Sequence, residues 1–346
     1  PVISSGLRIA GWQPYQGSIL QADISEETLT GWDRRQLFLD GKRQTRARFP
    51  KVDPADPWRS GLLAVEGPAE EKSFTAFRYP DGAFPRRWAR PSEAEVVMVI
   101  DWGYTTHSAL ESVDWKSRTM VMATGVRNFG QYRPWDTFCP DGSHFDFWIP
   151  YRFHVENVLE ELTAPGEWCV DTQERRVYFW PPDELTEGSE VSVPVLDCVI
   201  DVCGASWVRL EGLTFTETRN SGDNMHRTGN HGGGAMYPDP AYNYCGEAVH
   251  LSHAEYCRIA NCRFSEVGGN AICVEGYNLK NVIQGNEFGH TGHCGVTVIG
   301  AKDLGTEVRM PIATEVADNH FHHCGEYDTV APGVFCGASV GTAVRH

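Results

Sequence analysis

Short β-type runs recur near the end of the chain with a period in the low twenties. Val249, Ile272 and Val296 are 23 and 24 residues apart, and each begins a run in which apolar residues alternate with other residues. Phe264 and Phe288, 24 residues apart, belong to a second series. A strand repeat of this length is typical of a solenoid, which stacks residues that are distant in sequence into columns. The repeat therefore predicts which side chains are neighbours.

The apolar positions predict the interior of this solenoid. Strand residues that point inward recur at every second position. Two inward columns follow: one of Val249/Leu251, Ile272/Val274, Val296/Val298 and Val334/Cys336, and one of Phe215, Phe264, Phe288 and Phe321. Asn286 and Asn319 predict an interior column of amides that hydrogen-bond along the axis. Rungs of about 23 residues with two or three strands indicate a right-handed parallel β-helix.

The repeat divides the chain into two predicted domains. Residues 191–346 form the β-helix, and residues 1–190 form an opening coil with an inserted β-rich, sandwich-like domain, so the fold class is mainly β. The last rung stops partway at His346, so we expect a β-helix that is incomplete there. An open end exposes unpaired backbone, and we expect an additional segment or chain to cover it.

Local signals in the first domain predict a few individual elements. Asp40-Gly41 is a strong signal for a two-residue hairpin turn. Val155–Leu162 has the pattern of one short helix. Alternating apolar residues predict strands at Gln36–Leu39, Glu95–Ile100 and Arg176–Trp180.

Composition excludes several partners. The formal net charge is −16, which argues against nucleic acid and anionic membrane, because both need clustered Lys and Arg. No apolar run approaches the roughly 18 residues of a transmembrane helix. The 11 cysteines show no tight paired spacing, so they predict small packing residues rather than disulfides or zinc ligands. The cysteines expected to pack in or beside the repeat are Cys203, Cys257, Cys262, Cys273, Cys294 and Cys336.

Several segments resemble a known family of enzymes. Trp207–Phe215 and the Asn-x-x-Phe coils are similar to β-helix proteins of the pectin-lyase-like class. Arg35–Arg43, with Arg46–Pro50, and Pro165–Asp171, followed by Val177–Pro182, resemble glycoside hydrolases with α-L-fucosidase and xylanase activities. The resemblance implies a β-rich domain inserted early in a β-helix, hydrolysis of a plant- or algal-type glycan, and a secreted or periplasmic protein. The free cysteines favour a reducing compartment instead.

A cluster of ionisable residues is predicted at one turn of the repeat. Glu266, His290 and His323 each lie two residues after a Phe of the Phe column. His293 and Glu326 each lie five residues after such a Phe. Neighbouring rungs are about 4.8 Å apart, so His290 should lie close to His323. Turn residues are often polar only because they face water, but five ionisable groups at one turn are typical of a catalytic site.

Glycosidases use two carboxylates, and this turn supplies them. We expect Glu266 and Glu326 to act as acid and base, with Asp328 or Glu247 as substitutes. Two rungs separate the pair, which favours an inverting reaction. His290 and His323 would orient the substrate or tune the carboxylates, although the resemblance implies Asp at their positions. No cofactor is expected.

Three other functions fit the same residues. His290, His293, His323 and Glu326 could together hold zinc or another transition metal. A polysaccharide lyase or epimerase would use a His or Tyr base beside a uronate, but the acidic charge opposes it. A non-catalytic scaffold would bind the oligo- or polysaccharide without cleaving it.

Substrate-binding residues are predicted in three places around this turn. Glu247 and His250 lie on the outward face of the first strand of each rung, and His293 lies at the turn itself. The long Gly-rich loop Asn220–Gly246 offers aromatic and polar groups, which suit sugar rings and hydroxyls. The loop residues expected to bind sugar are Asp223, His226, His231, Tyr242 and Tyr244.

Overall fold

The computed structural model describes residues 1–57, 60–70, 73, 75–99, 105–123, 151–220, 246–300, 309–327 and 331–346. Its elements are almost all strands, and among the described residues α1 (Glu26–Gly31) is the one α-helix. This confirms the mainly β prediction. The chain forms two compact units. The first unit contains residues 1–10, 25–43 and 188–346, and the second contains residues 11–24 and 44–187.

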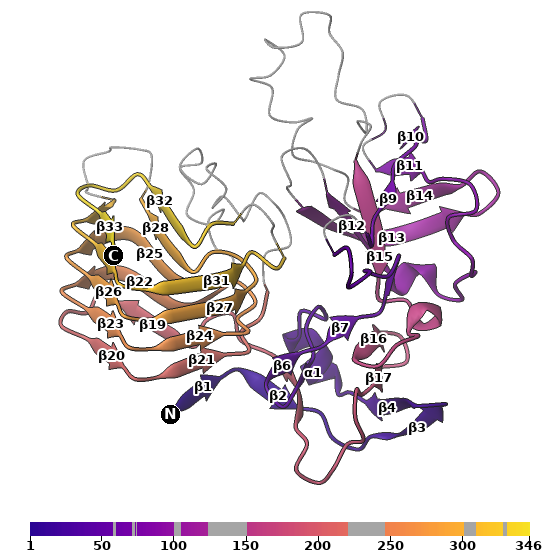
Figure 1. The fold of residues 1–346 in the computed structure, drawn as a ribbon, viewed down its shortest axis with the longest axis horizontal. Helices are drawn as coiled ribbons and strands as arrows, with labels where there is room; N and C mark the ends of the chain where they lie inside the picture. The colour runs from indigo at the N-terminus through magenta and orange to yellow at the C-terminus, as the bar shows by residue number, and fades with distance from the viewer. Residues whose placement is uncertain are drawn as a thin grey trace, which may run out of the picture. The chain divides into compact units, whose positions relative to one another are not determined.

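Three parallel sheets dominate the first unit (Figure 1). Sheet one contains β19 (Ile200–Cys203), β22 (Glu247–Glu255), β25 (Asn270–Leu279), β28 (Val296–Ile299) and β32 (Val334–Gly337), with β29 (Pro311–Ile312) also paired to β25. Sheet two contains β20 (Arg209–Glu211), β23 (Arg258–Ala260), β26 (Val282–Gln284), β30 (Glu315–Ala317) and β33 (Ala343–Arg345). Sheet three contains β1 (Val2–Ser4), β21 (Thr214–Thr216), β24 (Arg263–Ser265), β27 (Glu287–Thr291) and β31 (His320–Cys324).

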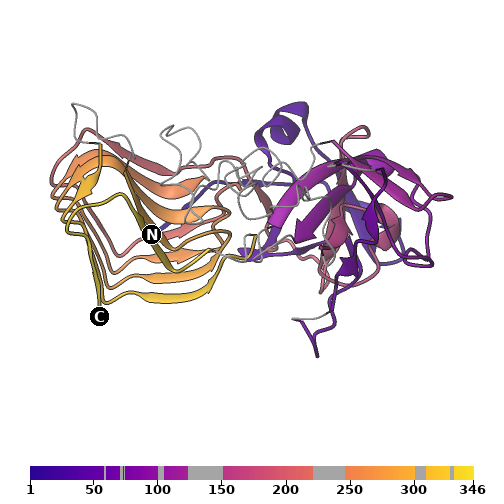
Figure 2. The ribbon, with the colours of Figure 1, turned by 90° about the horizontal axis from the view of Figure 1, so that it is seen from above.

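The chain visits these sheets in a fixed order. β22, β23 and β24 belong to sheets one, two and three, and β25 then returns to sheet one beside β22. Each such round is called a coil below. The strands of successive coils lie one above another in Figure 2. Equivalent residues of successive coils are therefore paired in register, as the period of the sequence predicted.

The predicted inward columns are confirmed except at Cys336, which is exposed in the last coil. Phe215, Phe264, Phe288 and Phe321 are register partners from coil to coil. Their rings are stacked, with centroids 4.7, 5.0 and 4.7 Å apart in that order. In sheet one the column runs Val249, Ile272, Val296 and Val334. Burial of these apolar side chains removes them from water, which is the main force that holds the coils together.

The predicted amide column is also present. Asn286 Nδ2 donates to Asn319 Oδ1 over 3.0 Å and to the carbonyl of Ile259 over 3.1 Å. Asn286 Oδ1 accepts from the backbone N–H of Cys262 over 2.9 Å. Asn319 repeats the pattern by donating to the carbonyl of Ile283. These amides satisfy backbone groups at a turn where no strand neighbour can reach them.

A small antiparallel sheet brings one hairpin to the coils. It contains β2 (Gly6–Arg8), β18 (Val191–Pro194), β5 (Phe38–Leu39) and β6 (Lys42–Arg43). The predicted Asp40-Gly41 turn joins β5 to β6, and both turn residues have positive φ, 51° and 74°. Two positive φ values are those of a type I′ turn, for which Asp-Gly is well suited. The hairpin ends at Arg43.

The second unit is built from two further sheets and aromatic core residues such as Trp168 and Phe153. One sheet contains β10 (Gly67–Pro68), β11 (Ala76–Arg78), β14 (Thr119–Met122), β13 (Thr105–Asp114), β12 (Glu95–Val99), β15 (Arg152–Glu156), β8 (Arg48–Phe49) and β9 (Leu63–Ala64). The other contains β3 (Gln13–Gln16), β4 (Ile19–Asp23), β17 (Arg176–Trp180), β16 (Glu167–Asp171) and β7 (Thr45–Arg46). Two short 3₁₀ helices are η1 (Pro91–Glu93) and η4 (Leu159–Glu161).

Some local predictions are wrong. The helix expected over Val155–Leu162 is reduced to η4, because Val155 is buried in β15 and pairs with Val96 of the sheet. Tertiary pairing overrides the local helical pattern there. Cys203 and Cys336 are exposed rather than packed inside, while Cys257, Cys262, Cys273 and Cys294 are buried, as predicted. Within the described ranges, no helix is both long and apolar enough to cross a membrane.

Candidate functional site

The turn between sheet three and sheet one, called the third turn below, carries the predicted ionisable cluster. Its equivalent positions in successive coils are Glu217, Glu266, His290 and His323, with φ of 56°, 58°, 55° and 52°. This left-handed backbone is uncommon for residues other than glycine. Because the same backbone recurs in each coil, side chains from neighbouring coils stack. The rings of His290 and His323 are nearly parallel, with centroids 4.7 Å apart, which confirms the predicted proximity.

Arg43 joins the two predicted catalytic carboxylates. Its Nη1 forms an ion pair with Glu326 Oε2 and lies 3.7 Å from Glu266 Oε2. Its Nη2 donates to the carbonyl of Val267 over 3.2 Å. The guanidinium also lies over the ring of Tyr327, 5.3 Å from the centroid. Burial disfavours its charge, but the acidic groups of Tyr327, Glu326 and Glu266 outweigh burial and raise the pKa of Arg43.

The two carboxylates have different surroundings. Burial raises the pKa of Glu266 above its usual value, and the charge of Glu326 adds to this, while Arg43 and His290 oppose it. Glu326 is more exposed, with 33% of its side chain accessible against 15% for Glu266. Its Oε1 accepts a 2.7 Å hydrogen bond from His290 Nδ1. Glu326 is thus held between a guanidinium and an imidazole, whereas Glu266 lies farther from the guanidinium and also interacts with the backbone of Arg43.

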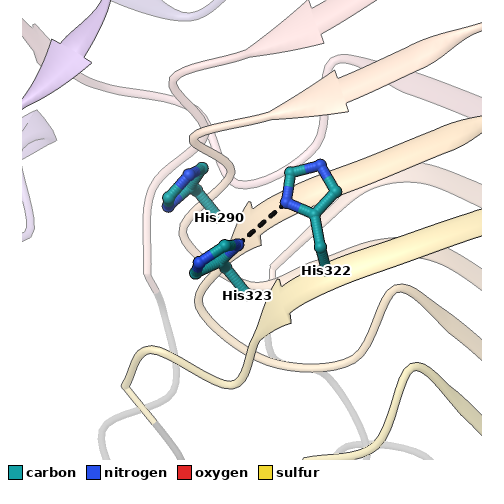
Figure 3. Close-up of side chains that lie close together, drawn as sticks. All are labelled: His290, His322 and His323. Atoms are coloured by element: carbon teal, nitrogen blue, oxygen red, sulfur yellow. Dashed lines mark hydrogen bonds between the residues drawn. The ribbon is translucent and has the colours of Figure 1, made fainter.

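A third imidazole joins the stacked pair at the third turn. His322 Nδ1 lies 3.0 Å from His323 Nδ1, as the dashed line in Figure 3 shows. One nitrogen atom from each of His290, His322 and His323 lies within 4.8 Å of the others. These atoms could hold a metal ion. The predicted metal set was different, because it included His293, whose side chain is buried at 2% exposure.

Glu217 continues the same column but has a structural role. Its side chain accepts hydrogen bonds from the hydroxyls of Ser4 and Ser192, each at 3.0 Å. A Cβ atom at Gly6 would lie 1.9 Å from Glu217 Oε2, so the chain packs directly against this carboxyl. Burial raises the pKa of Glu217. The ionisable patch therefore begins at Glu266 and not one coil earlier.

The outward face of sheet one carries a second charged group. His250 Nδ1 lies 3.0 Å from Asp201 Oδ1, and its Nε2 lies 3.2 Å from Glu275 Oε2. Burial lowers the pKa of His250, but Glu275, Glu247 and Asp201 outweigh that effect and raise it to about 9. Glu247 is buried and accepts a hydrogen bond from the Asn270 amide over 3.3 Å. His250 and Glu247 are therefore fixed by neighbours.

Other predicted site residues lie outside the described residues. They are Asp328, which follows Tyr327 in the sequence, and Asp223, His226, His231, Tyr242 and Tyr244 of the long loop. Sequence reasoning missed Arg43, His322 and Tyr327, which contribute contacts at the third turn. Arg43 lies outside the repeat, but it ends the Arg35–Arg43 segment that carried the family resemblance. That segment was a usable signal.

Comparisons with known proteins define the fold class. No family model matches the sequence, and no curated protein matches it. Among solved structures, the chain is similar to a protein named "Glycoside hydrolase", with a TM-score of 0.77 and 20% sequence identity. The match covers 100% of this chain and 63% of that protein, so this chain spans less than two thirds of its length. The chain therefore has a mainly β fold shared with a glycoside hydrolase.

Proposed function

We propose that this chain hydrolyses glycosidic bonds in a plant- or algal-type glycan. The fold shared with a protein named glycoside hydrolase supports this proposal. The observation that carries it is the convergence of Glu266 and Glu326 on one nitrogen of Arg43. Two carboxylates in contrasting environments are the basic requirement of glycosidase chemistry.

The proposed architecture is a right-handed parallel β-helix of the pectin-lyase-like class, with the second unit inserted into it. The successive parallel pairings of three sheets support a helical winding. Connections between parallel strands are right-handed in about 98% of cases, which supports the hand. In such a winding the third turn repeats along one side, so residues of several coils can contact one sugar chain.

The contrasting environments assign the two roles. Glu266 would be the general acid, because its raised pKa favours a carboxyl that still carries a proton to donate to the leaving oxygen. Glu326 would be the nucleophile or base, oriented by His290 Nδ1 and by Arg43. His323, stacked on His290, would help to position that ring. His250 would contact the substrate from the neighbouring face, because 18% of its side chain is exposed, whereas the predicted contact by Glu247 is ruled out by its burial.

The stereochemical outcome follows from the shared contact with Arg43. Two rungs of separation favoured inversion, but both carboxylates reach the same Nη1 atom. The shared contact brings their nearest oxygens closer than two rungs of separation predicted, so we favour a retaining reaction, in which the two carboxyl groups are roughly 5–5.5 Å apart. In a retaining reaction, Glu326 bonds to the anomeric carbon as the glycosidic C–O bond breaks, and Glu266 donates its proton to the leaving oxygen. Glu266, now ionised, then takes a proton from water, whose oxygen bonds to the anomeric carbon and displaces Glu326.

Substitution of the two carboxylates tests this proposal. Plant and algal glycans are screened for hydrolysis, and the anomeric form of the first product is followed by proton NMR. Glu266→Gln and Glu326→Gln should each abolish turnover while glycan binding persists. Glu211→Gln, on exposed β20, is the matched control and should leave turnover unchanged. Unchanged turnover in both site variants would overturn the assignment, and binding without any turnover in the unaltered protein would favour a non-catalytic scaffold.

A further inference from the structure

Three histidines from two successive coils converge at the third turn (Figure 3). His290 ends one coil, and His322 and His323 end the next. We propose that these three side chains bind a divalent transition-metal ion, with zinc as the simplest occupant. Imidazole nitrogen is a preferred ligand of zinc, copper and nickel. This inference goes beyond the proposed hydrolysis and does not depend on it.

The spacing of the nitrogen atoms suits a metal. His322 Nδ1 and His323 Nδ1 are 3.0 Å apart. Zinc–nitrogen bonds of about 2.0–2.1 Å at tetrahedral angles place two ligand atoms about 3.3 Å apart, close to this distance. The three ligand atoms all lie within 4.8 Å of one another. The rings of His290 and His323 are nearly parallel, and an imidazole binds a metal in the plane of its ring, so one ring has to turn. His323 is exposed, so its ring can turn out of the stack toward the ion.

Carboxylates occupy the other nitrogen of two of these rings. His290 Nδ1 contacts Glu326 Oε1 at 2.7 Å, which leaves Nε2 for the metal. His322 Nε2 contacts Glu287 Oε1 at 3.4 Å, which leaves Nδ1. A metal-binding histidine usually donates its second N–H to such a carboxylate, which fixes the ring and makes it a better ligand. This outer shell distinguishes the group from a chance surface cluster.

Gly289 makes room for one of the ligands. His322 pairs with Gly289 of the preceding coil, and its ring lies over that residue. A Cβ atom at position 289 would be 2.2 Å from His322 Cε1 and 2.7 Å from Nε2. Any side chain there would displace the imidazole. The backbone of one coil is therefore shaped to accept a ring from the next.

The surroundings favour a cation and leave it accessible. The chain carries a net charge of −16, and Glu287 and Glu326 lie directly behind the imidazoles. The ring of His320 lies 5.1 Å from that of His322 and could guide an ion toward the site. With three protein ligands, a tetrahedral metal would keep one position for water.

Zinc binding by the purified full chain tests the proposal. The protein is stripped with a chelator, and ZnCl₂ is titrated against a chromophoric chelator that competes for the ion. We expect one zinc per chain with a dissociation constant in the micromolar range or tighter. Cobalt(II) at the same site should show the intense visible absorption of a tetrahedral complex. Failure to bind zinc at 100 µM (about a hundredfold above a micromolar constant) would overturn the proposal.

Matched variants locate the ion. Removal of an outer-shell partner alone weakens metal binding about tenfold to a hundredfold. His322→Ala and His323→Ala each remove a direct ligand, so each should weaken zinc binding by at least that factor. Gly289→Ala should weaken it through displacement of His322, whereas His253→Ala, which removes an exposed imidazole elsewhere, should not. Zinc binding that persists in both ligand variants would place the ion elsewhere and refute the site. Glu266→Gln should abolish hydrolysis without weakening zinc binding, so each proposal can fail alone.

Discussion

Replacement of Arg43 by Met gives a direct measure of how strongly the third turn is held together. The change removes the ion pair with Glu326 and the bond to the Val267 carbonyl. Val267 keeps its bond from the N–H of Gly292, so its carbonyl is not left unsatisfied. Glu326 keeps its bond from His290 but loses its cationic partner. The main loss is therefore one charge-assisted contact.

The magnitude follows from the exposure of the partners. A hydrogen bond to a charged group contributes about 1.5–3 kcal/mol. Breaking a fully buried pair costs about 3–5 kcal/mol, but 33% of the Glu326 side chain is accessible, so water can replace part of the interaction. We expect Arg43→Met to lower the free energy of unfolding by about 2 kcal/mol. The loss of Arg43 should also raise the pKa of Glu266 further.

Urea unfolding of a double-mutant cycle measures this effect. Arg43→Met, Glu326→Gln and the double variant are compared with the unaltered protein. If the ion pair organises the turn, the double variant is less destabilised than the sum of the single variants. Arg43→Lys serves as the control, because an ammonium keeps the charge but lacks the fork that reaches Glu326 and Val267 together. Additive losses, or a loss below about 0.5 kcal/mol for Arg43→Met, would refute the reasoning.

Two further predictions concern other parts of the coils. The pKa of His250, about 9, is raised above the usual histidine value of 6.5. Its pairing with Asp201 and Glu275 therefore stabilises the fold fully below pH 6.5, and this contribution is lost as pH rises through 9. His250→Gln should therefore cost about 3 kcal/mol at pH 6 and little at pH 10, as urea unfolding at each pH would show, and a pH-independent difference would contradict this. Asn286→Ala removes the partners of the Cys262 N–H and the Ile259 carbonyl and should cost about 2–6 kcal/mol. Thermal unfolding measures this loss, and Asn261→Gly, at an exposed turn whose positive φ suits Gly, is the control.

The repeat predicted the side-chain contacts that depend only on the spacing between equivalent residues. Columns such as Phe264 on Phe288 follow from a fixed spacing, because equivalent residues of parallel strands pair in register. The stacking of His290 on His323 follows in the same way. These contacts are set by local patterning and by the geometry of stacked strands, so a sequence can show them without knowledge of any distant segment.

The remaining contacts depend on features that the period does not contain. Arg43 reaches the third turn because its hairpin is paired through β5 to β18, and nothing in the repeat encodes that pairing. His322 reaches the imidazole group because Gly289 leaves space beneath it. His293 was placed on the surface by counting from the Phe column, but it is buried at 2% exposure. A turn can change direction within three residues, so counting past the strand end does not fix where a side chain points.

Left-handed backbone by itself does not mark the functional turn. All three turns of each coil contain a residue with positive φ. The turn from sheet two to sheet three uses Gly212, Asn261, Gly285 and Asp318, which tolerate this conformation at little cost. The turn from sheet one to sheet two uses Trp207, Tyr256, Lys280 and Ala313, of which Trp207 and Tyr256 are stacked.

The third turn differs from both in the chemistry of its side chains. From Glu266 onward it places a carboxylate and two imidazoles at positions where Gly or Asn would relieve the backbone, at a cost of about 1–2 kcal/mol per residue. The turn from sheet one to sheet two carries the same cost at Trp207, Tyr256, Lys280 and Ala313, so strain supplies no argument for catalysis. The argument rests on the carboxylates and imidazoles themselves. Glu266→Gln, which keeps the shape and backbone and removes only the titratable group, is therefore the substitution that separates chemistry from architecture.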